Sequence, residues 1–447
     1  MAFGSDLRYY YAIMDVFLKI FSGIINGSIA VFSYSWWIIL PVFLFVIAWD
    51  LWLVYIRTKY VESAERMTFE IKIPKEILKT PKAMEAVFNT LIGSYSFGFS
   101  SVDTYLSGKV ETRISFEMVG HAGGVRFYVR THVDFKNLIE SAVYAQYPSA
   151  ELVPVEDYIN SLPPVLPDEN YDIWGTELIL ARENYYPIKT YQFFEETQDE
   201  KRLDPLAAII ETMSNLKEDE WIGIQVLISP TGEPSGNMWQ KEGYEKIEEM
   251  AGRKSAKKTK DSELMAWVRN LAWAPAEQPV WGEEKKPDAP TLKFLHPAEQ
   301  EIAKGIGNKV SKIGFETVIR FIYIDSAKSF TSANVSAIMG AFNQFRANDM
   351  NALKPDKRTV TLRNTWFAKL FPMYKKFFVF SRKRRLFESY RTRRFGKHNR
   401  IRDEKFSVLS TEELATIYHF PAIMIESPNL IRLGGKKGGP PAELPVE

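Results

Sequence analysis

The stretch Val110–Thr131, VETRISFEMVGHAGGVRFYVRT, contains two segments in which apolar and polar residues alternate, separated by His121–Gly124. Alternation with a period of two is typical of strands, and a short link that contains glycine predicts a β-hairpin between them. The glycines of this link are explained by the turn itself. We therefore expect an antiparallel pair of strands at this point of the chain.

The segments on both sides of this hairpin extend the pattern. A helix is predicted over Ala83–Ile92, with Pro81 near its first turn, and further elements follow the same logic. These are strands at Met67–Pro74 and Glu151–Val155 and a helix at Phe135–Tyr147. The resulting order, β-α-β-β-α-β over Met67–Asp157, is typical of a ferredoxin-like (split βαβ) unit.

A second part of the chain repeats this logic after the proline-rich segment Ser161–Pro167, which is typical of a domain boundary. Its predicted elements are strands at Glu177–Arg182, Ile188–Gln192, Trp221–Ile228 and Glu316–Ile324, and helices at Pro205–Leu216, Trp239–Gly252, Pro297–Lys312 and Thr331–Arg346. Arg253–His296 is rich in Lys, Pro, Glu and Ala and indicates a surface insertion. The predicted fold class is α+β, with two ferredoxin-like units separated by a hinge.

The most apolar stretch of the chain is Trp36–Ile56, WWIILPVFLFVIAWDLWLVYI. A helix of this length spans about 30 Å, the thickness of the hydrocarbon core of a bilayer. The residues that would form this anchor are aromatic residues at its ends, a tolerated proline and one acid: Trp36, Trp37, Pro41, Asp50, Trp52 and Tyr55. Asp50 either reaches the interface or makes a polar contact between subunits. The sequence thus predicts a transmembrane helix and a lipid bilayer as partner.

Residues 7–32 are apolar but contain charges and glycines. An amphipathic helix lying on the membrane fits them better than a second span, although a re-entrant or spanning helix stays open. Lys and Arg are more frequent after Trp36–Ile56 than before it, which predicts a single-pass protein with its C-terminal body in the cytoplasm. The expected domains are 1–33 (interfacial helix), 34–57 (transmembrane helix), 67–160 (first α+β domain), 168–350 (second α+β domain, with insertion 253–296) and 351–447 (basic aromatic segment and tail).

Composition excludes several classes of site. The chain has 447 residues, no cysteine and only five histidines, no two of which lie within five positions. Disulfides, Cys-ligated metals, thiol nucleophiles and local His pairs are therefore excluded. The phosphate-binding motif G-x-x-x-x-G-K-[ST], G-x-S-x-G and H-E-x-x-H are absent. Acidic pairs such as Glu218–Glu220 and Glu412–Glu413 are expected at solvated helix ends, and His419 is expected to be packed or capping. We expect no catalytic, cofactor-binding or metal-binding residue.

The formal net charge of +2 conceals a strongly basic band. Between Lys375 and Arg402 there are twelve Lys and Arg and a single acid, Glu388, and aromatic residues are interleaved with them. The candidate binding residues of this band are Arg382, Lys383, Arg384, Arg385, Arg391, Arg393, Arg394, Lys397, Arg400 and Arg402. Three partners suit this composition: nucleic acid, anionic lipid, or the acidic body of a neighbouring subunit.

Several segments also resemble known proteins. Thr411–Pro421 (TEELATIYHFP), with Pro428 and the tail KKGGPPAELPV, resembles a segment of type IV secretion and conjugative-transfer ATPases that lies just before the nucleotide-binding domain. The segments 128–158, 187–196, 204–216, 315–324 and 337–345 resemble the N-terminal region of membrane-anchored ATPases of this type from candidate-phylum bacteria. The resemblance implies a bacterial inner-membrane protein without the motor, and it carries over no catalytic residue.

The sequence therefore predicts a non-catalytic, membrane-anchored scaffold of a type IV secretion-like or conjugation-like complex. It would self-associate as a homo-oligomer and dock a separate ATPase. Two alternatives stay open, a membrane-tethered nucleic-acid-binding protein that uses the band at 375–402, and a membrane-shaping scaffold unrelated to DNA transfer.

Overall fold

The computed structural model describes residues 3–74, 79–96, 99–122, 124–195, 204–232, 238–252, 296–361, 372–395, 406–421 and 432–433. The described residues form two units. One contains the N-terminal helix α1 (Phe3–Ser63) and Ser101–Lys109, and the other, which we call the body, contains the remaining described residues.

The N-terminal helix α1 is continuous over 61 residues. The predicted interfacial and transmembrane segments are therefore parts of one helix, which includes Gly23 and Gly27. Glycine lowers helix stability by only about 1 kcal/mol per residue, which a helix of this length tolerates. Within the described residues, Trp36–Ser63 is the part of a helix that is long and apolar enough to cross a membrane.

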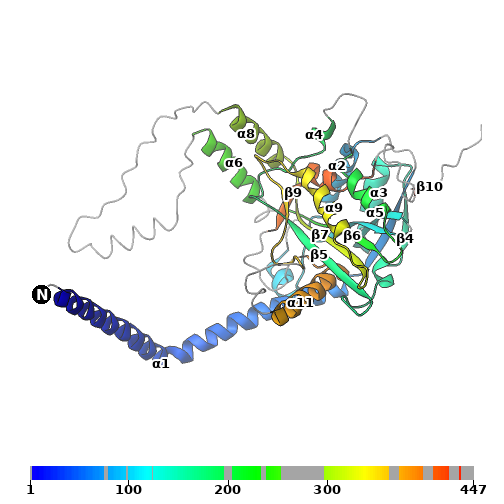
Figure 1. The fold of residues 1–447 in the computed structure, drawn as a ribbon. Coiled ribbons are helices and arrows are strands. Elements are labelled where there is room, and N and C mark those ends of the chain that lie inside the picture. The colour runs from blue at the N-terminus through cyan, green and yellow to red at the C-terminus, as the bar shows by residue number, and fades with distance from the viewer. Residues whose placement is uncertain are drawn as a thin grey trace, which may run out of the picture. The chain divides into compact units, whose positions relative to one another are not determined.

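The body is built on a mostly antiparallel sheet, so the predicted α+β class is confirmed (Figure 1). The first half of the sheet has the strand order β4-β1-β3-β2, and the second has β6-β7-β5-β8. Two short strands extend it: β9 pairs with β7, and β10 pairs with β1. The strands are β1 (Arg66–Pro74), β2 (Ile114–His121), β3 (Gly124–His132), β4 (Glu151–Val155), β5 (Tyr171–Leu180), β6 (Trp221–Pro230), β7 (Gly314–Ser326), β8 (Leu353–Pro355), β9 (Ser407–Ser410) and β10 (Arg432–Leu433).

The two halves share one sheet and one core. Strands β2 and β6 pair along their whole length, from Ile114 opposite Ile228 to His121 opposite Trp221. The segments on either side of Ser161–Pro167 thus lie in one compact unit, because backbone hydrogen bonds and a common hydrophobic cluster join the halves. Local sequence patterns contain no information about such edge-to-edge pairing.

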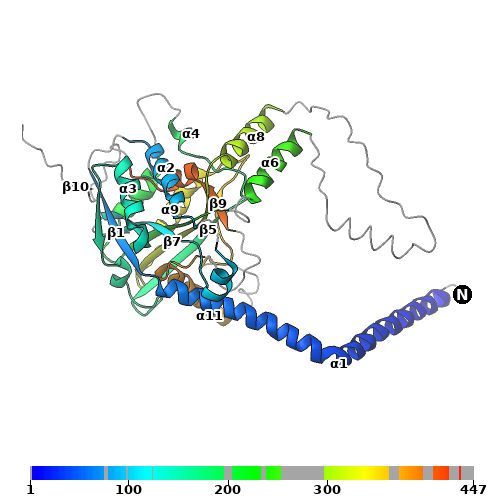
Figure 2. The ribbon, with the colours of Figure 1, turned by 180° about the vertical axis from the view of Figure 1, so that it is seen from behind.

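Helices cover one face of the sheet, where alternate strand residues such as Phe69, Phe116, Ile224 and Phe321 form the main core with them (Figure 2). These helices are α2 (Pro81–Thr90), α3 (Lys136–Gln146), α5 (Ala207–Ser214), α9 (Ala333–Phe342) and α12 (Thr411–Ile417). Two more, α6 (Met238–Met250) and α8 (Pro297–Val310), pack together around a smaller cluster. Short elements complete the body: α4 (Gln192–Glu195), η1 (Leu91–Ser94), η3 (Val133–Phe135), η4 (Tyr158–Ser161) and η5 (Asn343–Phe345).

One further expectation needs correction. The predicted strand Ile188–Gln192 is absent: the Ile188 and Tyr191 amides donate to side chains of α12, and Gln192 belongs to α4. Within 351–447, β8 and β9 join the sheet and α12 lies in the core. The predicted insertion at 253–296 lies outside the described residues, except for His296.

Candidate functional site

A row of polar side chains crosses the face of the sheet opposite the main helices. Glu177, Arg320, Gln225 and Glu117 stand directly opposite one another on β5, β7, β6 and β2. Gln225 and Glu117 are fully buried and Arg320 is nearly so. Because a buried polar group without a hydrogen bond is costly, this row requires partners from another element.

The partner element is helix α11 (Pro372–Arg391), which packs on this face through Leu386, Phe387 and Tyr390 (Figure 1). Two glycines allow the close approach. A Cβ at Gly175 would lie 2.6 Å from the Leu386 side chain, and a Cβ at Gly223 would lie 2.1 Å from the Tyr390 hydroxyl. Any side chain at either position would push α11 away from the sheet.

Side chains from the row bind the C-terminal end of α11. Arg320 donates to the carbonyl oxygens of Ser389 (2.9 Å) and Arg394 (2.8 Å), and Gln225 donates to that of Tyr390 (3.1 Å). Carbonyls at the end of a helix lack helical partners, and a cation there also suits the helix dipole. Arg320 keeps its own counter-ion, Glu177, at 2.6 Å.

The turn that follows α11 places a second cation on the sheet. Arg393 has the left-handed backbone angle φ 46°, and its guanidinium binds Glu117 (Nε–Oε1 2.8 Å) and Asp157 (Nη2–Oδ1 2.8 Å). Tyr158 donates to Glu117 and shares a 2.8 Å hydrogen bond with Tyr390. We call Glu117, Asp157, Tyr158 and Arg393 the buried ion cluster.

Electrostatics keep this cluster charged. Burial raises the pKa of Glu117, but the charge of Arg393 and the hydrogen bonds from Arg393, Ser115 and Tyr158 together outweigh burial, so the net result is a lowered pKa. The pKa of Asp157 is likewise lowered, because Arg393, Arg130 and the Ile159 amide together outweigh burial. Burial disfavours charged Arg393, yet Glu117 raises its pKa well above the usual value. The arrangement is that of an internal ion network rather than an acid–base pair poised near neutral pH.

The predicted basic band is therefore not a single exposed surface. Four of its residues have partners inside the body: Arg382 donates to the Val360 carbonyl, Lys383 pairs with Asp172, Arg391 donates to the Pro164 carbonyl, and Arg393 joins the buried ion cluster. The side chains of Arg384, Arg385 and Arg394 are exposed. Lys397, Arg400 and Arg402 lie outside the described residues.

The exposed part of α11 combines rings with cations. Phe377 is 68% exposed and Phe380 is 42% exposed, and the Arg384 guanidinium lies 4.9 Å from the centroid of the Phe380 ring. Lys376 and Arg385 are exposed on the same helix. We call Lys376, Phe377, Phe380, Arg384 and Arg385 the α11 surface.

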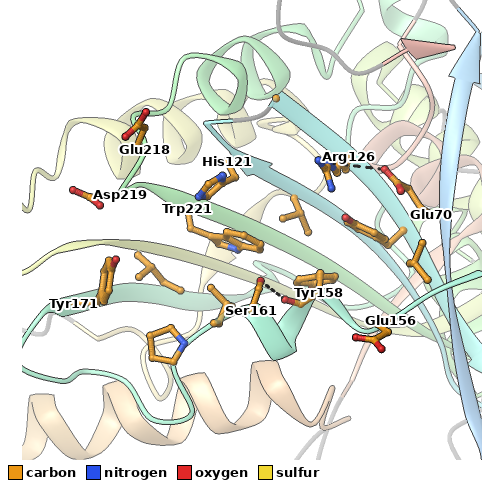
Figure 3. Close-up of a pocket in the computed structure, with 17 residues that line it drawn as sticks. Glu70, His121, Arg126, Glu156, Tyr158, Ser161, Tyr171, Glu218, Asp219 and Trp221 are labelled. Carbon is orange, nitrogen blue, oxygen red and sulfur yellow. Dashed lines mark hydrogen bonds and ion pairs between the residues drawn. The ribbon is translucent and has the colours of Figure 1, made fainter. Parts of the chain in front are cut away.

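A groove of about 740 Å³ opens on the same face of the sheet as α11 (Figure 3). Four rings from different elements follow one another along it: His121 of β2, Trp221 of β6, Tyr158 of η4 and Tyr128 of β3. Successive ring centroids are 5.3, 5.8 and 4.9 Å apart. We call these four residues the ring row.

Carboxylates surround the ring row. Glu218 and Asp219 lie at the His121 end, and Glu70 and Glu156 lie toward the other end (Figure 3). Arg126 is the one Lys or Arg among the lining residues, and it lies 3.9 Å from Glu70. The groove is therefore aromatic and net acidic, unlike the α11 surface.

The residues predicted to form the membrane anchor are exposed along α1 in the protein alone. Trp36, Trp37 and Tyr55 are 51%, 62% and 58% exposed. Pro41 and Asp50 are also exposed, within the helix.

A short segment packs against the end of this helix. Trp52 donates to the Tyr105 carbonyl (3.1 Å) in η2 (Asp103–Ser107). A Cβ at Gly108, whose φ is 67°, would lie 2.6 Å from the Ile56 backbone. Glycine is thus required where Ser101–Lys109 meets α1.

The acidic pairs expected at solvated helix ends are partly buried instead. Glu413 is fully buried, caps α12 through Ser410 and pairs with buried Lys309 at 3.0 Å. Glu220 is also buried and accepts a hydrogen bond from Tyr323. His419 is buried between Ala415 and Asp204, as a packed residue. In the part of the chain that is described, no group of three or more His, Asp or Glu is placed to hold a metal.

Sequence reasoning missed the polar row and the groove. A signal for the row was present, since Glu117, Gln225 and Arg320 each interrupt an otherwise apolar strand: SFEMV, GIQVL and VIRFI. A lone polar residue in such a strand indicates a buried partner. The ring row had no comparable signal, because its rings come from four elements that only the fold brings together.

The described residues thus form an α+β protein, with a mostly antiparallel sheet and one apolar N-terminal helix that is long enough to cross a membrane. A family model described as "Domain of unknown function (DUF8128)" matches residues 62–432, which is most of the chain. The chain belongs to this family. No curated protein matches the sequence.

Proposed function

We propose that this protein is a non-catalytic scaffold, anchored in a membrane by α1 and carrying the body on the cytoplasmic side. The observation that carries the proposal is the exposed apolar stretch Trp36–Ser63, which is followed by β1 after only Ala64 and Glu65. Val102 and Leu106, in the segment that packs on α1, are 59% and 63% exposed and supply more apolar surface.

The sheet suits a scaffold. The strand orders β4-β1-β3-β2 and β8-β5-β7-β6 support our interpretation that each half is a ferredoxin-like unit, with its helices in the connections. The most heavily buried ion pairs of the described chain, Arg393–Glu117 and Lys309–Glu413, hold elements of the body together. Nothing in their geometry requires a substrate.

The resemblance of Thr411–Pro421 and the upstream segments to type IV secretion and conjugative-transfer ATPases supports a place in a bacterial complex of that kind. In this proposal the protein forms a homo-oligomer in the inner membrane and docks a separate ATPase. The cations available for contacts between subunits are Arg384 and Arg385, because the neighbouring Arg382 and Lys383 already bind within the body.

The test is the particle mass of the full chain in detergent, by light scattering and negative-stain imaging. We expect a closed assembly whose mass is a multiple of 51.5 kDa. The double variant R384E/R385E should split it, whereas K357E/R358E, an equal charge change at exposed positions, should not. A monomeric wild-type protein, or equal behaviour of both variants, would contradict self-association through this surface.

A second candidate function is contact of the α11 surface with anionic lipid, as in a membrane-shaping scaffold. Exposed phenylalanines beside arginines suit a lipid interface, where the rings enter the apolar boundary and the cations pair with anionic head groups. A fluorophore at position 380 should be quenched by brominated lipids more strongly in anionic than in neutral nanodiscs. Equal quenching would argue against lipid contact, and binding of single-stranded DNA that weakens steeply with salt would favour the nucleic-acid alternative.

A further inference from the structure

The groove beside α11 has the dimensions of a binding site. Its volume of about 740 Å³ lies within the range of about 300–1,000 Å³ that is usual for ligand sites. The ring row forms its floor, where Tyr128 and Tyr158 are largely buried while His121 is exposed at one end. Trp221 is partly exposed, so the accessible rings of the row are those of His121 and Trp221. Accessible aromatic faces attract either stacked bases or cations.

Charge decides between these ligands. Glu218 and Asp219 flank the His121 end of the ring row, Glu156 lies near the other end, and Arg126 is partly neutralised by Glu70. Phosphates would meet carboxylates at both ends, so nucleic acid is disfavoured. A cation would be attracted by the carboxylates and by the ring faces together.

The ring row already contacts one cation. The Arg393 guanidinium lies 5.3 Å from the centroid of the Tyr158 ring. Arg393 is buried and belongs to the ion cluster, so it does not occupy the groove. This contact nevertheless shows that a guanidinium fits against a ring of this row.

We propose that the groove binds an extended basic peptide of a partner protein, with an Arg or Lys side chain lying against the partly exposed ring of Trp221, beside exposed His121. The carboxylates of Glu218 and Asp219 would pair with the next cation of the peptide. This inference gives the proposed scaffold a class of partner and rests on that function for its biological setting. The groove itself lies entirely within the body, so peptide binding is measured separately from anchoring and assembly.

The test uses the full chain in dodecylmaltoside, whose head group carries no cation. A fluorescent hexapeptide of alternating Arg and Gly is titrated and followed by anisotropy, with the Glu–Gly peptide and a single-stranded oligonucleotide as other occupants. We expect the Arg peptide to bind, and to bind more weakly as salt rises from about 50 to about 500 mM. The Glu peptide and the oligonucleotide should not compete for the groove.

Variants locate the site. E218Q/D219N should weaken binding about 3- to 10-fold, and W221A about tenfold. E242Q/E248Q, an equal charge change on exposed residues of α6, should change it less than about twofold. Because E218Q/D219N alters exposed side chains only, it keeps the test valid if W221A fails to fold.

The inference is overturned if the Arg and Glu peptides bind equally, or if E218Q/D219N and E242Q/E248Q weaken binding to the same extent. It is also overturned if the oligonucleotide displaces the peptide from wild-type protein but not from E218Q/D219N, because the groove would then bind nucleic acid. Peptide binding by a monomeric protein would support the groove and contradict self-association, so the two proposals fail separately.

Discussion

Replacing Arg393 by methionine tests whether the buried ion cluster holds α11 on the sheet. The arginine side chain is 4% exposed, and its partner Glu117 is fully buried. Methionine keeps the left-handed backbone and much of the side-chain length, so the substitution mainly removes the charge. Loss of one member of a buried pair costs about 3–5 kcal/mol, because fully buried Glu117 is left without its ion-pair partner, whereas Asp157 keeps Arg130 at 3.2 Å.

The assay is thermal unfolding of the full chain in detergent, followed by tryptophan fluorescence, with hydrogen exchange of the α11 amides. We expect the midpoint to fall by roughly 5–10 °C and α11 to exchange faster. The double variant E117Q/R393M should be more stable than the sum of the single changes indicates, since it removes both charges of the closest pair.

The matched control is R394M, because the Arg394 side chain is exposed and only its carbonyl is used by the sheet. This variant should leave the midpoint within about 1 °C of wild type, as is usual for surface substitutions. If R393M and R394M had the same midpoint, or if α11 exchange were unchanged in R393M, the structural role of the ion cluster would be refuted.

Three further outcomes follow from the same structure. Replacing Gly223 by alanine places a Cβ 2.1 Å from the Tyr390 hydroxyl and should lower the thermal midpoint, whereas alanine at Gly340, where nothing lies within 4 Å, should not; a lowered midpoint in the Gly340 variant alone would contradict this. The two carboxylates that bind Arg393 have lowered pKa values, so their contribution to stability is fully present above their ordinary values near 4 and is lost as the pH falls from there through the lowered values. Protection factors of the α11 amides that stay constant from pH 7 to about pH 3 would be inconsistent with this. Replacing Lys309 by methionine leaves buried Glu413 without a cation and should lower the free energy of unfolding by about 3–5 kcal/mol. Urea unfolding measures this change, and a loss below about 1 kcal/mol would show that the pair is dispensable.

Local patterns predicted the parts of the fold that local forces determine. The hairpin around His121–Gly124 and the helix after Pro81 lie where alternation and proline placement indicate them. The apolar stretch Trp36–Ile56 is helical, as its composition requires. The prediction was wrong at Ile188–Gln192, because that backbone binds α12 side chains that come more than 200 residues later.

The basic band shows why counting charges does not define a binding surface. Arg384 and Arg393 are equivalent in the sequence, yet one is exposed and the other is buried against Glu117. Their difference depends on the rotation of α11 and on the turn after it. The close approach that allows this docking is between Gly223 and Tyr390, which are 167 positions apart in the chain.

The amino-acid sequence by itself determined the apolar N-terminal helix, the α+β class, and the absence of cysteine chemistry, because these depend on composition and on periods of two and 3.6 residues. Only the tertiary structure decided that the two halves share one sheet, that four basic residues bind to other residues of the body, and that four rings line an acidic groove. Each of these depends on contacts between distant segments, whose energies arise from pairing and burial that no local window contains.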